Sequence, residues 1–236
     1  GTPNCGASVG TATCINCSAP TVTAVADSAD CFGSNNGVVQ VLANGAILPI
    51  TFSTGSQSNS TGLFSGLGAG VYAVEVVDAQ ACPQSIFVTV GQPDSLSVAV
   101  NMVQPLECHG DTNVQLSALV AGGNGGFSLL WSNGQTGSNA DNFSAGFASV
   151  TATDAKGCTG ADTVLLTQPD ELSLSVSLVA DILCFGDSTG ALNTVVAGGA
   201  TPYKYAWSSG QTDSNLTNLM AGTYAVTVTD NNGCVD

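Results

Sequence analysis

The stretch "AGTYAVTVTDNNGC" (221–234) decides the fold, because it holds a strand pattern, a turn pattern and a cysteine in direct succession. Two valines alternate with two threonines in its first half, and a period of two is typical of a half-buried β-strand. The "DNNG" that follows supplies residues that tolerate a positive φ, so it predicts a turn. A partner strand is expected after Cys234, but only Val235 and Asp236 follow it.

Outward from this stretch, the chain repeats itself at intervals of 76 or 77 residues. Trp131 recurs as Trp207, and Phe52 is the expected substitute in the first copy. The other recurring segments are "QPD" at 92–94 and 168–170, "AGVY", "AGFA" and "AGTY" at 69–72, 145–148 and 221–224, and "DCFGSNN", "ECHGDTN" and "LCFGDST" at 30–36, 107–113 and 183–189. The expected segments are the tail of a preceding repeat (1–20), repeat 1 (21–94), repeat 2 (95–170) and repeat 3 (171–236), the last without its final strand.

Each copy predicts six or seven short strands, so the expected fold is all-β, with tandem immunoglobulin-like β-sandwich repeats of about 76 residues. In the third copy the strand patterns are "LSLSVSLV" (172–179), "ALNTVVAGG", "YKYAWS" and "TYAVTVTD". Alternate aromatic residues of "YKYAWS" share one face of the strand, and we expect that face to pack into the core.

Composition excludes several classes of function. The 236 residues carry 2 Lys or Arg against 17 Asp or Glu, with a formal net charge of -15. Binding to nucleic acid requires basic side chains at the phosphates, so no nucleic-acid partner is expected. No basic amphipathic helix, membrane-spanning run or signal peptide is recognisable, so we expect no membrane insertion.

The cysteines follow the same period, which predicts disulfides in a secreted protein. The two series are Cys5, Cys82, Cys158 and Cys234, and Cys31, Cys108 and Cys184. Pairing within a copy (Cys31–Cys82, Cys108–Cys158, Cys184–Cys234) is favoured if four strands separate the partners, because both then lie at one end of the sandwich. The alternative pairs across a linker (Cys5–Cys31, Cys82–Cys108, Cys158–Cys184), where about two strands intervene.

Metal sites have weaker support. "CINC" (Cys14 and Cys17) lacks the further ligands of a zinc site, so a local disulfide or a bond to a neighbouring chain is expected instead. If Cys184–Cys234 closed, Asp187 and Asp230 would meet, and oxygen ligands suit calcium. Asp111 and Asp154 are the matching pair in the second copy, while turn chemistry alone also explains aspartates at these places.

No catalytic constellation recurs, so the chain is expected not to be an enzyme. His109 stands where the other copies have Phe, which favours a packing role in the turn. "GGNGG" (122–126) has no phosphate-binding lysine or dinucleotide fingerprint around it and is interpreted as a loop. No cofactor other than the calcium candidate is predicted.

The third copy, "CFGDSTG…AGGATPYKYAWSSGQT…NLMAGTYAVTVTDNNGC", resembles the SprB-type repeat of Bacteroidetes gliding-motility adhesins. The resemblance covers nearly all of 21–236 and is weakest in the first copy. It implies a very large repetitive protein, exported by the type IX secretion system to the cell surface, that serves adhesion and gliding. Ser28, Ser95, Thr163 and Ser188 resemble the Bacteroidetes O-glycosylation motif, and Asn16, Asn59, Asn142 and Asn215 lie in N-x-S/T sequons.

The expected function is therefore that of structural spacer repeats in an extracellular adhesin or surface filament. One alternative is a polymerising filament subunit whose missing strand is donated by an identical chain. Another is a carbohydrate-binding module of a secreted enzyme, which would need exposed aromatic residues. The expected partners are neighbouring repeats or identical chains, with a surface polysaccharide as a further candidate.

Overall fold

The structure is a computed structural model that describes residues 18–81 and 83–236. All regular structure in these residues is β-strand, and the strand pairs are antiparallel. This confirms the predicted all-β class of tandem immunoglobulin-like sandwiches. The chain divides into two compact units, Gly1–Leu96 with Ala121–Gly126 and Asp154–Cys158, and Ser97–Val120 with Phe127–Thr153 and Thr159–Asp236.

Three hydrophobic cores lie within these units, one in each of the predicted repeats. The predicted repeat limits themselves (21–94, 95–170 and 171–236) stay predictions.

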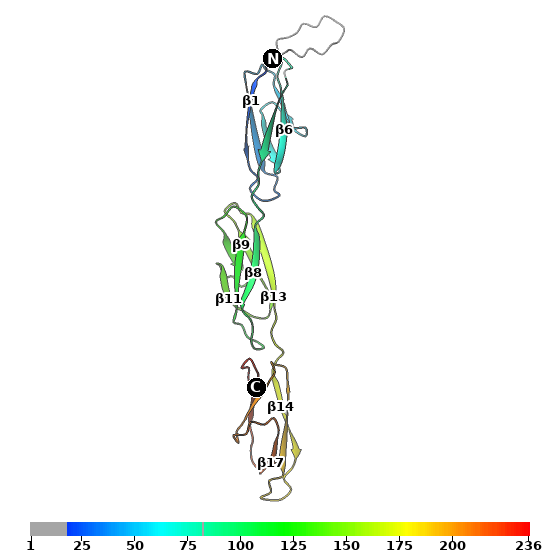
Figure 1. Cartoon of the computed structure of the whole chain (residues 1–236), viewed down its shortest axis with the longest axis vertical. Helices are drawn as coiled ribbons and strands as arrows, with labels where there is room; N and C mark the ends of the chain where they lie inside the picture. The colour runs from blue at the N-terminus through cyan, green and yellow to red at the C-terminus, as the bar shows by residue number, and fades with distance from the viewer. Residues whose placement is uncertain (1–17, 82) are drawn as a thin grey trace. The chain divides into compact units, whose positions relative to one another are not determined.

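The first repeat contains two sheets, with orders β1-β2-β5 and β4-β3-β6-β7. Figure 1 labels one strand of each sheet, β1 and β6. Its strands are β1 (Thr21–Asp27), β2 (Gly37–Asn44), β3 (Thr51–Ser53), β4 (Ser58–Asn59), β5 (Leu63–Leu67), β6 (Gly70–Val77) and β7 (Gln84–Val90). Phe52 is buried in β3 and belongs to the core. It pairs with Val76, whose counterpart Ala152 pairs with Leu129, so Phe52 fills the core from the position of Leu129 and not from that of Trp131.

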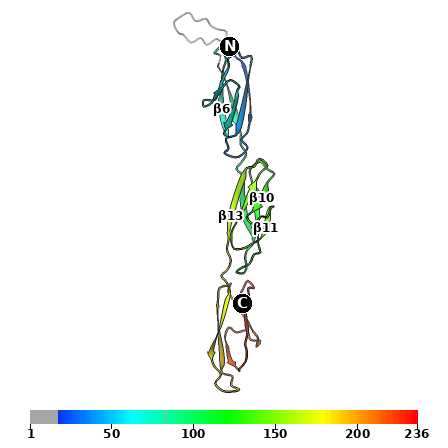
Figure 2. The same ribbon diagram turned by 180° about the vertical axis from the view of Figure 1, so that it is seen from behind.

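The second repeat has sheets of order β11-β9-β8 and β10-β12-β13. Figure 2 labels β11 of the first sheet and β10 and β13 of the second. Its strands are β8 (Ser97–Gln104), β9 (Val114–Ala121), β10 (Ser128–Trp131), β11 (Asn139–Phe143), β12 (Gly146–Thr153) and β13 (Thr159–Leu166). In β9, Val114, Leu116 and Ala118 point into the core while the residues between them do not, as the period of two requires.

The third repeat has sheets of order β14-β15-β17 and β16-β18, with no strand in the position of β13. Its strands are β14 (Ser173–Ala180), β15 (Gly190–Ala197), β16 (Lys204–Trp207), β17 (Leu216–Leu219) and β18 (Val226–Thr229). Each predicted strand pattern of this copy forms a strand, although "TYAVTVTD" is regular only from Val226. Val235 makes an isolated bridge to Thr229, and pairing stops there.

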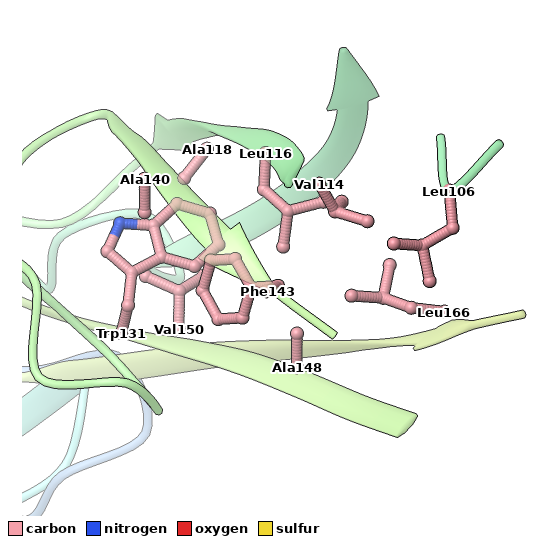
Figure 3. Packing of buried hydrophobic residues seen from close by; sticks show 10 residues of the cluster. All are labelled: Leu106, Val114, Leu116, Ala118, Trp131, Ala140, Phe143, Ala148, Val150 and Leu166. Carbon is pink, nitrogen blue, oxygen red and sulfur yellow. The ribbon is translucent and has the colours of Figure 1, made fainter. Parts of the chain in front are cut away.

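The tryptophans fill the middle of the cores. Trp131 is 2% exposed, and its ring centroid lies 5.8 Å from that of Phe143 (Figure 3). Its indole N–H donates to the Gly137 carbonyl at 2.9 Å, so the buried donor is satisfied. The predicted aromatic face is confirmed at both tryptophans, whereas Phe127 at the outer end of the face is 42% exposed.

Two local features recur at the repeat period. One is a tyrosine hydrogen bond in the first and third repeats, and the other is a left-handed residue in all three. Tyr72 donates its hydroxyl proton to the Gly68 carbonyl and Tyr224 to the Met220 carbonyl, both at 3.0 Å, as in a tyrosine corner. The strand before this corner contains a left-handed residue in every copy, namely Gly66, Asn142 and Asn218 with φ of 74°, 59° and 56°. Glycine and asparagine are the residues that tolerate this conformation best.

Candidate functional site: the repeat junctions

In each repeat one strand (β6, β12 or β18) is followed by a turn built on a buried aspartate. The three aspartates, spaced by 76 residues, are Asp78, Asp154 and Asp230. Asp154 accepts hydrogen bonds from the backbone N–H groups of Lys156 and Cys158 on Oδ1 and from the backbone and side-chain amides of Asn124 on Oδ2, at 2.8 to 2.9 Å. Burial raises the pKa of this carboxyl, but the bonds outweigh it, and the pKa lies below its usual range.

Asp230 repeats this arrangement. Its carboxylate accepts from the backbone N–H groups of Ala200 at 2.8 Å and of Asn232 and Cys234 at 2.9 Å. The bond from Ala200 contributes most to holding the pKa of Asp230 below its usual range, and burial opposes it. In both repeats the carboxylate therefore connects the cysteine-bearing turn to the loop that follows the second strand. We call this loop, residues 122–126 in the second repeat and 198–200 in the third, the glycine loop.

The glycine loop in turn holds the linker that enters the repeat. The backbone N–H of Gly123 donates to the Asp94 carbonyl at 3.0 Å, and Gly199 donates to Asp170 at 2.9 Å. The preceding glycine, Gly122, has φ of +78°, and a Cβ there would lie 2.1 Å from the Ser95 carbonyl oxygen. Only glycine fits this approach, so the "AGG" of the second and third copies is required by the linker.

The "QPD" linker also contacts the repeat that it leaves. Gln92 accepts the backbone N–H of Gly33 at 2.8 Å, and Gln168 accepts that of Gly110 at 2.9 Å. Each linker thus holds the Cys-x-Gly turn of one repeat with its glutamine and the glycine loop of the next with its aspartate carbonyl. Sequence analysis found the tripeptide but not this role, which its fixed distance from both motifs could have indicated.

The disulfides join these same turns. Cys31 bonds to Cys158 and Cys108 bonds to Cys234, with Cα–Cα distances of 5.6 and 5.7 Å. The favoured pairing within a copy is therefore wrong for Cys31–Cys82, Cys108–Cys158 and Cys184–Cys234, because at least one cysteine of each pair has another partner. The alternative pairs Cys5–Cys31, Cys82–Cys108 and Cys158–Cys184 are wrong for the same reason. Each bond joins the Cys-x-Gly turn of one predicted repeat to the Asp-x-x-Gly-Cys turn of the next.

The strand count explains why pairing within a copy fails. Between Cys108 and Cys158 the chain makes three passes along the sandwich: β9, then β10 and β11 together, then β12. β10 pairs only with residues 150–153 of β12 and β11 only with residues 114–117 of β9, so each covers half of one pass. An odd number of passes puts the two cysteines at opposite ends of the sandwich. The Cys108 turn lies by Gln168, just after β13, whereas Cys158 lies just before this strand of 8 residues. Eight residues at about 3.3 Å each separate the two ends by roughly 26 Å.

An amide cap accompanies each disulfide. The Asn124 side-chain amide donates to the Asp30 carbonyl, and that of Asn232 donates to the Glu107 carbonyl, both at 2.8 Å. Asn124 comes from a glycine loop and Asn232 from a cysteine turn, so two different loops supply the same donor. At the first junction Lys156 also forms a 3.1 Å ion pair with Asp30, and its hydrogen bond is the main cause that lowers the pKa of that carboxyl.

The remaining predicted sites have mixed outcomes. Because Cys184–Cys234 does not form, the closure that was to bring Asp187 to Asp230 is absent, and the described residues contain no group of three or more His, Cys, Asp or Glu placed to hold a metal. Asp111 accepts a hydrogen bond from the Cys108 backbone N–H at 2.9 Å, a turn role like that of Asp154. Calcium binding stays a prediction, without the support of a Cys184–Cys234 bond that would bring Asp187 to Asp230.

Other candidates lie on the surface or outside the described residues. Cys184 is free and exposed, and His109 is exposed in its turn, which corrects its predicted packing role. Ser28, Ser95, Thr163 and Ser188 are all exposed, so their glycosylation stays a prediction at accessible sites. Cys5, Cys14, Cys17 and Cys82 lie outside the described residues. In the part of the chain that the structure describes, no helix is long and apolar enough to cross a bilayer.

Comparison with protein families finds one match: residues 177–212 match the SprB repeat. The match begins in β14, runs through the Cys184 turn and the glycine loop, and ends just after Trp207. The chain thus carries a SprB-type repeat, as its third copy predicts. No curated protein matches the chain.

Solved structures give only distant likenesses. Three N-terminal domains of the bacteriophage RB49 outer capsid protein Hoc are 15% identical, with a TM-score of 0.39, over 92% of this chain and 86% of that chain. A C-terminal intimin fragment, solved with the intimin-binding domain of its translocated receptor, is 11% identical, with a TM-score of 0.36, over 67% of each chain. Fibronectin(III)-like modules of Clostridium thermocellum CbhA are 15% identical, with a TM-score of 0.26, over 63% of this chain and 95% of theirs. Similarities this low carry no argument about function.

Proposed function

We propose that this chain, which carries a SprB repeat at residues 177–212, is a spacer segment of a secreted surface adhesin. Its β-sandwich repeats hold the adhesive part of the protein away from the cell, and they serve adhesion and gliding. The observation that carries the proposal is the same cross-junction bond at both junctions, Cys31–Cys158 and Cys108–Cys234.

The chemistry of the junctions supports an extracellular location. Disulfides persist in oxidising compartments and are rare where thiols are kept reduced. At each junction a disulfide, an asparagine amide cap and a glutamine hydrogen bond limit the conformational freedom of the linker. A spacer needs such a restriction. The match to the SprB repeat supports the proposal that the chain is part of a surface repeat protein with a structural, non-enzymatic role.

The test uses antibodies against residues 1–236 on intact cells of the source organism. We expect labelling without permeabilisation, and we expect a mutant that lacks the gene to attach and glide less well than its parent. Labelling only after permeabilisation would overturn the surface location. Normal attachment and gliding of the mutant, with labelling retained, would overturn the adhesive role alone.

A second candidate is a filament subunit completed by strand donation, and one observation favours it. The third repeat has no strand in the position of β13, and β14 exposes Val176 and Leu178 at 46% and 63%. Sedimentation of the purified chain over a range of concentrations separates the two: the spacer predicts a monomer, and the filament predicts chains that grow with concentration. The carbohydrate-binding module is less well supported, because Trp131 and Trp207 are both buried.

A further inference from the structure

The third Cys-x-Gly turn has the same sequence pattern as the two that form junctions. Cys31 and Cys108 each bond to a cysteine 127 or 126 residues later, and Cys184 holds the same position in the period. In both occupied turns the carbonyl before the cysteine accepts an asparagine amide of the next repeat, and the glycine N–H after it donates to the linker glutamine. The corresponding groups of the third turn are the Leu183 carbonyl and the Gly186 N–H.

The surface around this turn is open and apolar. Leu183 and Phe185 are 88% and 109% exposed, and Cys184 is a free thiol beside them. A pocket of about 670 Å³ adjoins the turn, lined among others by Ile182, Leu219 and Tyr224. At the same end of the second repeat, Leu106, Phe143 and Leu166 are buried, and Leu166 belongs to β13.

We propose that the Cys184 turn is the docking surface for a further repeat of the same kind, joined to it by a Gln-Pro-Asp linker in the same polypeptide. Its Asp-x-x-Gly-Cys cysteine forms a disulfide with Cys184, an asparagine amide caps the Leu183 carbonyl, and the linker glutamine accepts the Gly186 N–H. The inference concerns the junction alone and stands whether or not the chain serves adhesion.

The occupant is a repeat in the same polypeptide because the linker is itself part of both observed junctions. Gln92 and Gln168 contact the turn, while Asp94 and Asp170 contact the incoming glycine loop. A separate chain would bring the cysteine without this tether.

The bond forms by thiol–disulfide exchange. The two thiols lose two protons and two electrons as the S–S bond forms, and a small-molecule or protein disulfide accepts them and becomes two thiols.

Two extended chains test the proposal. The long one is residues 1–234 followed by a second copy of 159–234, in which the copied Cys184 is replaced by serine. The short one is residues 1–234 followed only by a second copy of 159–170, which supplies a last strand and a linker but no further repeat. Both are oxidised with a glutathione mixture, alkylated, and mapped by non-reducing peptide mass spectrometry.

We expect Cys184 to be alkylated in the short chain and bonded to the copied Cys234 in the long one. Alkylation of both cysteines in the long chain would overturn the proposal, and so would a Cys184–Cys184 bond between chains. A long chain with the copied Cys234→Ser tests docking without the bond. There, alkylation of Cys184 should be slower than in the short chain by about tenfold, which corresponds to about 1.4 kcal/mol of docking. Equal rates would overturn it.

Discussion

The second and third repeats share their sequence pattern but differ in their cores. In the second, ten buried residues form one cluster, whereas in the third only Trp207, Leu216 and Leu219 do. Leu116 is 1% exposed, and its counterpart 76 residues later, Leu192, is only half-buried. The difference between the two cores comes from the last strand. In the second repeat β13 pairs with β12 along its length, and the third repeat has no counterpart of β13.

The last strand therefore does two things for a sandwich. It extends one sheet, and it lies against the first strand of the other sheet, as the hydrogen bond from the Val100 N–H to Asp162 at 2.8 Å marks. In the third repeat only the carboxylate of Asp236 reaches the first strand, at the Leu174 N–H. Without a last strand, the third repeat depends more for its stability on its other contacts, such as the disulfide to the second repeat.

The disulfides give the largest expected difference between the two repeats. Replacement of Cys108 and Cys234 by serine removes a bond that closes a loop of over 100 residues, for which chain entropy alone gives up to about 5 kcal/mol. We expect the third repeat to lose more protection than the second, and hydrogen exchange in β15 and β9 measures it. The Cys31→Ser, Cys158→Ser chain is the control, and it should leave β15 unchanged. Equal loss in β9 and β15 after the first replacement would contradict the comparison.

Truncation of matched core leucines comes next. Leu116→Ala should lower the free energy of unfolding by about 3 kcal/mol, since a fully buried leucine leaves a cavity. Leu192→Ala should lower it by about 1 kcal/mol or less, because its side chain is already partly in water. Urea unfolding followed by the fluorescence of Trp131, in a Trp207→Phe background, and of Trp207, in a Trp131→Phe background, assigns each loss to its repeat. Equal losses would show that the third core is as closed as the second.

Acid should affect both repeats in the same direction. The pKa values of Asp154 and Asp230 are lowered by folding, so their contribution to stability is present above their unfolded pKa of about 3.9 and is lost as pH falls through the folded value. Asp154→Asn and Asp230→Asn should each raise the acid-unfolding midpoint, because each removes a carboxylate whose pKa is lowered by hydrogen bonds in the folded state. Circular dichroism between pH 6 and about pH 2 measures this window. A midpoint unchanged by both substitutions would contradict the role of the aspartates.

The left-handed asparagines give the smallest effect and should show no difference between repeats. Asn142→Ala and Asn218→Ala should each cost about 1 kcal/mol, because alanine is disfavoured at φ near +60°. The glycine variants are the controls and should be nearly neutral, since Gly66 already occupies this position in the first repeat. Thermal unfolding measures all four. A larger cost at one asparagine would indicate that the left-handed conformation there also depends on the last strand.

The fold could be predicted from local patterns, because they act at short range. Alternating valines and threonines, "DNNG" turns and the two tryptophans each predict an element that the structure contains. Phe127 deviates from this pattern: it lies one residue before β10, and its side chain is 42% exposed.

The disulfide pairing could not be predicted because it depends on which end of a sandwich each turn occupies. β10 and β11 share one pass, so the four strands between these cysteines make only three passes, and no local propensity shows that two strand patterns share a pass. Asn124, Asn232 and the linker glutamines were missed for a related reason: their partners lie 125 or 94 residues away for the asparagines and 59 or 58 for the glutamines. The spacing of 126 was present in the sequence, but so were the spacings of 50 and 26.

The staggered bonds also set how far the chain can be stretched. From Cys31 to Cys234 the backbone has 203 residues, which would extend to about 690 Å at about 3.4 Å per residue. Force applied at these points can pass instead through the Cys31–Cys158 bond, back along the 50 residues to Cys108, and through the Cys108–Cys234 bond. Even with every strand unfolded, these 50 residues and the two disulfides would limit the span to about 180 Å. The disulfides between repeats therefore limit how far the chain extends under force, whatever the stability of any one sandwich.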